Sequence, residues 1–315
     1  MPRTSRESRF VARRARFARR AAIRSVIKRI RARLPRGLKQ RLKPAYLLWL
    51  DLVDLVSGHR RRGLPPTRIM LPQYGRRDPA VFHEVGRWFV NDLVATCGLR
   101  PDQALLDVGC GAGRIGNAMA DFMSPAGSYD GFDVDRKSIA WASRHIASRH
   151  PHLRFRFVDV ANRQYNPGGT IPPEEFRFPY EADSFDVCFL HSVFTHMLPD
   201  NLRRYVAELR RVLRPGGAAY VSYYLYDEEA RRCLEARPDL PLRFEHSCGE
   251  YRTIDPSTPE YSVAYDEGFI RRIYAEAGLL IDEPVRRGGW CGRNTDRHQD
   301  VVVARKAMLS KEASA

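Results

Sequence analysis

The chain has 315 residues, 43% of them hydrophobic, and a formal net charge of +16. This length and apolar content suffice to bury one good-sized core, so we expect one domain with an extension and exclude a second full domain. The six cysteines show neither the paired C-x-x-C spacing of a zinc site nor a small disulfide framework. A reducing, cytoplasmic setting is therefore expected.

The positive charge is concentrated at the N-terminus. Residues 1–43 contain 17 lysines and arginines but a single acid, Glu7, whereas the rest of the chain has 36 basic and 36 acidic residues. Apolar residues recur in this arm at helical spacing, beside a cationic face: Ile23, Val26, Ile27, Ile30 and Leu34. The pattern predicts an amphipathic helix that ends at Pro35 and Gly37, and an anionic partner, either a membrane surface or a nucleic acid.

The next segment, residues 44–80, is expected to hold one short helix and a linker. Residues 46–56 are apolar, but the run is too short to span a bilayer and is interrupted by Asp51 and Asp54. Residues 57–80 are rich in glycine, proline and arginine, which indicates a linker or a cover over an active site. No apolar stretch follows the first arginines, which argues against a secretory signal.

From residue 81 the pattern alternates between helix and strand. A helix at 81–97 is followed by expected strands at 104–108, 128–132, 153–158, 185–190 and 218–223, with helices at 112–122, 136–148 and 200–213. Such alternation predicts βαβ units around a parallel sheet.

The C-terminal third is less regular. Residues 225–262 contain four prolines, so long elements are not expected there, and we predict that this insert shapes an acceptor pocket. A helix at 266–277 and strands near 279–285 and 300–304 follow. The catalytic domain is predicted at 81–306, with a disordered tail at 307–315.

The most informative segment runs from Leu105 to Arg114, where an apolar strand ends at Asp107 and turns through three alternate glycines. Glycines at these positions let a ligand approach the backbone, and the helix that follows would offer unpaired N–H groups to it. Gly111, Gly113 and Gly116 also spell G-x-G-x-x-G, a dinucleotide pattern. However, a carboxylate at Asp107 would repel phosphates and suits an amine.

The segment Asp107-Val-Gly-Cys-Gly-Ala-Gly113 resembles the first motif of class I S-adenosylmethionine-dependent methyltransferases. Four further landmarks of that family follow in order: Gly131 to Asp135, Arg154 to Asp159, Phe178 to Leu190 and Leu213 to Gly217. Ser192 to Leu198 and Trp290 to Arg293 resemble a bacterial subgroup whose substrates are mostly unassigned. The resemblance covers residues from about 72 to 306.

This resemblance implies an α/β, Rossmann-like fold with a mostly parallel seven-stranded sheet and an antiparallel last strand. It implies S-adenosylmethionine as cofactor, with Asp133 at the ribose and Asp159 at the adenine. Arg114 either pairs with the methionine carboxylate or is a solvent-facing or ion-paired residue. The expected cofactor contacts are Asp107, Gly109, Cys110, Gly111, Gly113, Arg114, Asp133, Val134, Asp159, Val160 and His191.

Methyl transfer from a sulfonium requires the two reactants to be held in line, and a base if the acceptor is a hydroxyl. Neither a metal nor a covalent intermediate is needed. His196 is the candidate base, because an imidazole titrates near neutrality; the alternative is a histidine that fixes its loop by hydrogen bonds. Candidate acceptor contacts are Tyr74, Tyr223, Trp290 and Arg293, since aromatic rings stack on sugars and arginine binds acidic groups.

Three classes of function stay open at this stage. The first is O-methylation of a sugar, glycolipid or other small molecule, with residues 1–43 on the cytoplasmic membrane face. The second is methylation of RNA, the ribosome or a protein, although His191-Ser-Val-Phe194 stands where base methylases carry Asn/Asp-Pro-Pro-aromatic. The third is a non-catalytic domain that binds the cofactor. An NAD-dependent oxidoreductase is disfavoured by Asp107.

Overall fold

A computed structural model describes residues 36–56, 63–75 and 78–308. The chain divides into two compact units, which we treat separately. Of the described residues, the first unit contains helix α2 (Arg36–Val56) and residues 66–72, and the second contains 63–65 and 73–308. The predicted apolar stripe at residues 23–34 lies outside the described residues, as does most of the predicted tail.

In the first unit, α2 is longer than the predicted helix at 46–56 and crosses the boundary predicted at residue 44. It contains Pro44, and Gly37 lies in its first turn. The predicted helix end at Pro35 and Gly37 belongs to the apolar stripe at residues 23–34, which lies outside the described residues. Asp51 and Asp54 are buried and bind the start of α3 (Thr67–Tyr74). None of the described helices is both long and apolar enough to cross a membrane.

The second unit contains a seven-stranded sheet in the order β10-β11-β5-β4-β1-β2-β3. Five neighbouring strands run parallel to one another: β5, β4, β1, β2 and β3. The other two are antiparallel, since β11 pairs with β5 and β10 pairs with β11 in opposite directions. This confirms the parallel sheet predicted from the alternating pattern, and also the seven-stranded Rossmann-like arrangement with an antiparallel last strand that the family resemblance implies. The strands are β1 (Ala104–Val108), β2 (Ser128–Asp133), β3 (Leu153–Phe157), β4 (Phe185–Leu190), β5 (Leu213–Tyr223), β10 (Leu279–Ile281) and β11 (Asp300–Lys306).

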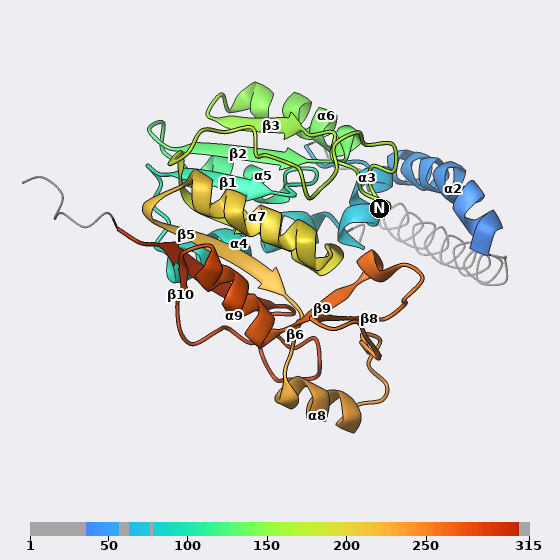
Figure 1. The fold of residues 1–315 in the computed structure, drawn as a ribbon. Coiled ribbons are helices and arrows are strands. Elements are labelled where there is room, and N and C mark those ends of the chain that lie inside the picture. The colour runs from blue at the N-terminus through green and yellow to red at the C-terminus, as the bar shows by residue number, and fades with distance from the viewer. Residues whose placement is uncertain (1–35, 57–62, 76–77, 309–315) are drawn as a thin grey trace, which may run out of the picture. The chain divides into compact units, whose positions relative to one another are not determined.

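Helices cover both faces of this sheet (Figure 1). Helix α4 packs beside α5, and α7 packs beside α9. Helix α4 begins two residues before the predicted start at residue 81, where the Asp78 side chain caps it by accepting a hydrogen bond from the Ala80 amide. The helices are α4 (Pro79–Cys97), α5 (Arg114–Phe122), α6 (Arg136–His145), α7 (Pro199–Val212) and α9 (Glu267–Glu276), with short 3-10 turns η1 (Ala147–Arg149), η2 (Phe194–His196) and η3 (Pro259–Tyr261).

The proline-containing insert forms a small subdomain of its own. Its four-stranded sheet has the order β6-β9-β8-β7, with strands of two to four residues, as the prolines predict. The insert also contains helix α8 (Glu228–Ala236), which the sequence analysis missed. Asp227 caps this helix by accepting a hydrogen bond from the Ala230 amide at 2.6 Å. The strands are β6 (Leu225–Tyr226), β7 (His246–Ser247), β8 (Tyr251–Thr253) and β9 (Val263–Asp266).

Candidate functional site

The strand order reverses between β1 and β4, and the carboxyl ends of these two strands therefore define the crevice where open α/β sheets bind ligands. Asp107 of β1 lies in register with Gly131 of β2 and with Phe189 of β4. The glycine turn that follows β1, residues 109–113, and the loop that follows β4 consequently lie at the same edge.

The three predicted glycines adopt positive φ angles: 78° at Gly109, 54° at Gly111 and 74° at Gly113. A Cβ at Gly109 would lie 2.6 Å from Val193 Cγ2, and one at Gly113 would lie 2.9 Å from a ring carbon of Phe155. These glycines therefore bring the turn against the loop after β4 and against β3. Their first role in this fold is close packing.

The amides of this turn are not free, which differs from the sequence-based expectation. Gly109 and Cys110 both donate to the Phe132 carbonyl, at 2.9 and 3.1 Å. The Gly111 amide donates to Asp133 Oδ2 at 2.7 Å, and the Ala112 amide is shared by two side chains of α3. Buried N–H groups need partners. Recognition at this edge consequently depends on side chains more than on bare backbone.

Two carboxyl groups flank the turn, that of buried Asp107 and that of half-buried Asp133. Asp107 is 2% exposed and accepts a hydrogen bond from the Tyr129 hydroxyl at 2.6 Å. Burial raises its pKa to about 7, even though that hydrogen bond acts in the opposite direction. Asp133 accepts from the amides of Gly111 and Asp135, and burial raises its pKa to about 6. Both groups are thus poised to change charge near neutral pH.

Arg114, at the start of α5, is the cation of this site. Its guanidinium lies 4.6 Å from the ring centroid of Tyr74 and 5.6 Å from that of Phe89. Its Nε is buried without a hydrogen-bond partner among the described residues, and burial lowers its pKa. Arg114 as a whole is half-buried. A partly buried cation with an unsatisfied donor is suited to bind an anionic group.

The other predicted cofactor contacts lie nearby but play varied roles. Cys110 packs under β2, where a Cβ at Gly131 would lie 2.8 Å from its sulfur, and burial raises its pKa well above the ordinary value. Val134 packs against the core, and Val160 is buried in it. The Asp159 carboxylate accepts from Asn166 and Thr170, which lowers its pKa and ties down the loop after β3.

His191 follows β4 and lies beside Arg114. Its ring stacks on Phe189 with an interplanar angle of 8° and meets the edge of Phe89 at 4.4 Å between centroids. Burial, together with the positive charge of Arg114, lowers the His191 pKa to about 3. The imidazole is therefore neutral in the physiological range.

The candidate base His196 lies in η2 and is half-buried. Its Nδ1 is 3.2 Å from the carbonyl oxygen of Glu260, so Nδ1 carries the proton and Nε2 is the acceptor nitrogen. Burial lowers the His196 pKa, which keeps the ring neutral at pH 7. The hydrogen bond to Glu260 is the one expected if His196 only fixes its loop. The same bond also leaves Nε2 without a proton, as a base requires.

The loop between His191 and His196 is held by a chain of polar side chains. Ser192 has φ 62°, its amide donates to Ser222 Oγ at 2.8 Å, and its hydroxyl accepts from Gln299 at 2.7 Å. Ser222 in turn donates to Gln299 at 2.7 Å. This network joins the ends of β4, β5 and β11 and fixes Val193 over Gly109.

The four predicted acceptor contacts do not gather in one place. Tyr74 lies on the glycine turn, where its hydroxyl accepts from the Ala112 amide at 3.1 Å. Tyr223 is fully buried, and its hydroxyl is bonded to that of Tyr274. Its ring belongs to the hydrophobic core, and we no longer assign Tyr223 to an acceptor pocket.

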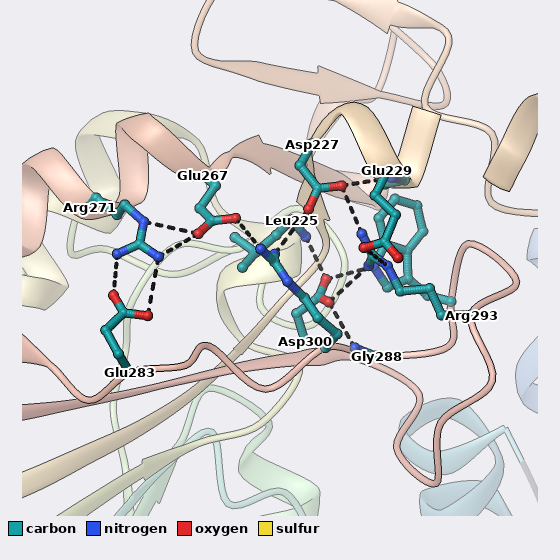
Figure 2. A network of polar contacts seen from close by, with 12 residues as sticks. Leu225, Asp227, Glu229, Glu267, Arg271, Glu283, Gly288, Arg293 and Asp300 are labelled. Carbon is teal, nitrogen blue, oxygen red and sulfur yellow. Dashed lines mark hydrogen bonds and ion pairs between the residues drawn. The ribbon is translucent and has the colours of Figure 1, made fainter. Parts of the chain in front are cut away.

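Arg293 belongs to a polar network that anchors the insert (Figure 2). The Trp290 indole joins this network at Asp300. The Trp290 indole donates to buried Asp300 at 2.6 Å, and Arg293 contacts Asp300, Asp227 and Glu229. Both side chains are thereby committed to holding α8 and β6 against β11. The sequence could not indicate this role for the turn at residues 290–293, because Asp227 and Asp300 lie outside it along the chain.

Sequence reasoning missed Gln73. Its oxygen accepts from the Ala112 amide at 2.9 Å, while its nitrogen donates to Asp135 and Ser138 at the start of α6. A Cβ at Gly111 would lie 2.5 Å from the Gln73 oxygen. A lone glutamine after a proline carries no motif, and only the fold brings it to the turn. No group of three or more potential metal ligands occurs in the described part of the chain.

Comparison with known proteins identifies the segment that contains this site. Residues 105–217 match the model of the family described as "Methyltransferase domain". A phthiotriol/phenolphthiotriol dimycocerosates methyltransferase of Mycobacterium ulcerans is 34% identical over 146 residues, 44% of each chain. An uncharacterized 37.1 kDa protein from a transposon of Streptomyces fradiae is 26% identical over 134 residues, 42% of this chain and 34% of its own. The matches thus span less than half the length of these relatives.

Solved structures of methyltransferases are also similar. One from Methanosarcina mazei has a TM-score of 0.45 at 20% identity and covers 70% of this chain and 98% of its own. One from Aquifex aeolicus has a TM-score of 0.45 at 17% identity, with coverages of 76% and 98%.

Proposed function

Because this chain belongs to the class I S-adenosylmethionine-dependent methyltransferases, we propose that it transfers the cofactor's methyl group to a hydroxyl of a sugar, glycolipid or other small acceptor at a membrane surface. The observation that carries the cofactor assignment is the buried Nε of Arg114, which has no hydrogen-bond partner among the described residues, near the carboxyl groups of Asp107 and Asp133, whose pKa values are raised. The zwitterionic methionine end of the cofactor has the complementary charges.

The residues present fit this cofactor. In the proposed arrangement Arg114 binds the methionine carboxylate, ionised Asp107 attracts the ammonium group, and Asp133 accepts hydrogen bonds from the ribose hydroxyls. Neutral His191 faces Arg114 and adds no competing charge. The bound cofactor supplies the methyl group. A pyrophosphate coenzyme fits less well, because Asp107 at the end of β1 would repel it.

The acceptor proposal has two supports. The relative from Mycobacterium ulcerans is named for methylation of phthiotriol and phenolphthiotriol dimycocerosates. In addition, residues 1–43 combine 17 basic residues with one acid, which suits anionic lipid. A hydroxyl acceptor needs its proton removed as the methyl group is transferred. We assign this proton to His196 Nε2, whose lone pair is available because Nδ1 donates to Glu260.

Calorimetry with S-adenosylmethionine, S-adenosylhomocysteine and NADH tests the cofactor assignment. The two adenosyl compounds should bind and NADH should not. Failure of both adenosyl compounds to bind folded protein would refute the assignment.

The acceptor class is tested with methyl-labelled cofactor and three separate substrates: a hydroxylated lipid fraction, total RNA and total protein. We expect label in the lipid fraction that survives mild alkali, since ethers resist conditions that hydrolyse methyl esters. Label in RNA or protein would instead support the second functional class. Cofactor binding without labelling of any fraction would favour a non-catalytic sensor.

A further inference from the structure

Helix α2 has an apolar stripe that the first unit leaves exposed. Leu48, Leu52 and Leu55 follow one another at helical i, i+4, i+7 spacing, and their side chains are 57%, 58% and 57% exposed. The same face extends in both directions along the helix through Leu38, Leu42 and Val56, exposed by 43%, 46% and 74%. Exposed leucines are ordinary singly, but a continuous row along one helix marks an interaction surface.

The opposite face of α2 is fixed to the protein. Leu50, Asp51 and Asp54 are buried there. Asp51 accepts from the Arg68 amide and pairs with its guanidinium at 2.7 Å, and Asp54 accepts from the Thr67 hydroxyl. Within the first unit these contacts set the rotation of α2 about its axis. They also turn both carboxylates of the apolar run away from the leucine stripe.

We infer that the leucine stripe, Leu38 to Val56, inserts into the interface of an anionic lipid bilayer. Two features select this occupant. Residues 1–43, which precede the stripe and overlap its first turns, have 17 basic residues and one acid. The acids of the stripe's own helix, Asp51 and Asp54, are buried on the other side. A basic segment joined to an apolar helix face is the combination that holds interfacial helices on anionic membranes.

The geometry fits a helix lying in the membrane plane. The stretch from Leu38 to Val56 is about 27 Å long at 1.5 Å per residue, and its strongly exposed apolar residues occupy one side. Each inserted leucine would contribute through burial of apolar surface, independent of salt, whereas the attraction of the basic arm is screened by salt. The two contributions can therefore be measured separately. This inference deepens the membrane location in the proposed function and does not depend on the acceptor.

The test is flotation of the full-length protein with phosphatidylglycerol/phosphatidylcholine vesicles. The variant L48S/L52S/L55S should bind at least tenfold more weakly than the unchanged protein, with an undiminished melting temperature and an unchanged affinity for S-adenosylhomocysteine. The single variant L52S is compared with the control L280S, because Leu280 is 65% exposed but lies on β10 of the second unit. Only L52S should weaken vesicle binding.

Salt distinguishes the stripe from the arm. At 0.5 M NaCl the difference between the triple variant and the unchanged protein should persist, while both bind more weakly than at low salt. Equal binding of the two proteins at either salt concentration would overturn the inference. So would a concentration-dependent dimer that the triple variant abolishes in the absence of lipid, because the stripe would then be a contact between two copies. In either case, unchanged cofactor binding would leave the methyltransferase proposal standing.

Discussion

The guanidinium of Arg114 lies over the ring of Tyr74, with its central carbon 4.6 Å from the ring centroid, and the buried Nε has no hydrogen-bond partner among the described residues. Aromatic rings hold the cation in place without neutralising it. This arrangement keeps a positive charge available at the edge of the glycine turn, beside Asp107.

We therefore expect R114M to weaken binding of S-adenosylhomocysteine by about ten- to a hundredfold, the effect of losing a charge-assisted hydrogen bond of about 1.5–3 kcal/mol. Binding of 5′-methylthioadenosine, which lacks the amino and carboxylate groups, should not change. R272M is the control, because Arg272 also covers an aromatic ring, that of Phe269, but lies on α9. Calorimetry with both ligands checks the prediction; equal losses for the two ligands would contradict a carboxylate contact.

Cofactor affinity should depend on pH. The pKa values of Asp107 and Asp133 are raised to about 7 and about 6 by burial, so both groups are protonated at pH 5 and ionised at pH 8. The ionised forms attract the ammonium group and accept from the ribose, and affinity for S-adenosylhomocysteine should therefore increase across this range. D107N should flatten the upper part of the curve and D133N the lower part. An affinity independent of pH in the unchanged protein would contradict these roles.

The same raised pKa predicts the opposite trend for the stability of the ligand-free protein. Protonated Asp107 favours the folded state, so its contribution is complete below the ordinary pKa of 3.8 and is lost as pH rises through about 7. D107N cannot ionise. Its melting temperature relative to the unchanged protein should consequently increase between pH 5 and pH 8, as thermal melts followed by circular dichroism can show; a constant difference would argue against this linkage.

The sheet and the glycine turn could be predicted because their signals are local. Strand periodicity, Asp107 and the glycines at 109, 111 and 113 all lie within ten residues of sequence. The buried environment of Arg114 could not be predicted in the same way. It depends on Tyr74 and Phe89, which precede it by 40 and 25 positions and reach it only through the fold.

The insert shows the same limit. Trp290 and Arg293 look like exposed recognition residues when only their glycine-rich turn is considered. In the structure their partners are Asp227 and Asp300, which come from the N-cap of α8 and from β11. A buried carboxylate such as Asp300, which accepts hydrogen bonds from several segments, gives no periodic pattern in the sequence. Its role can be recognised only in the folded structure, where those segments meet.

The role of His196 can be separated from its loop-fixing hydrogen bond. H196N retains an amide donor near the position of Nδ1 and can still bond the Glu260 carbonyl, but has no base. If His196 is the base, both H196A and H196N should lower kcat by about 10²–10⁴-fold without changing cofactor affinity. Because its pKa is lowered, the rate of the unchanged enzyme should be flat above pH 7. Near-normal turnover by H196N would mean that the histidine only fixes its loop.

Asp300 should be the most sensitive polar residue of the insert's anchoring network (Figure 2). It is fully buried and accepts from the amides of Leu225 and Gly288 and from the Trp290 indole, while pairing with Arg293 at 3.3 Å. In D300N the new side-chain NH2 group would face the N–H donors that now bind Asp300, and Arg293 would lose its buried carboxylate partner. We expect a loss of about 3 kcal/mol in the free energy of unfolding.

The matched control for D300N is E283Q in the same network. Glu283 pairs with Arg271 at the exposed end, where solvent screens the charges, so its loss should change the unfolding free energy by less than about 0.5 kcal/mol. Urea titrations of both variants measure the difference. Equal small effects would mean that the backbone of the insert holds its position without Asp300. In that case the Trp290 to Arg293 turn would again be available for a role at the acceptor.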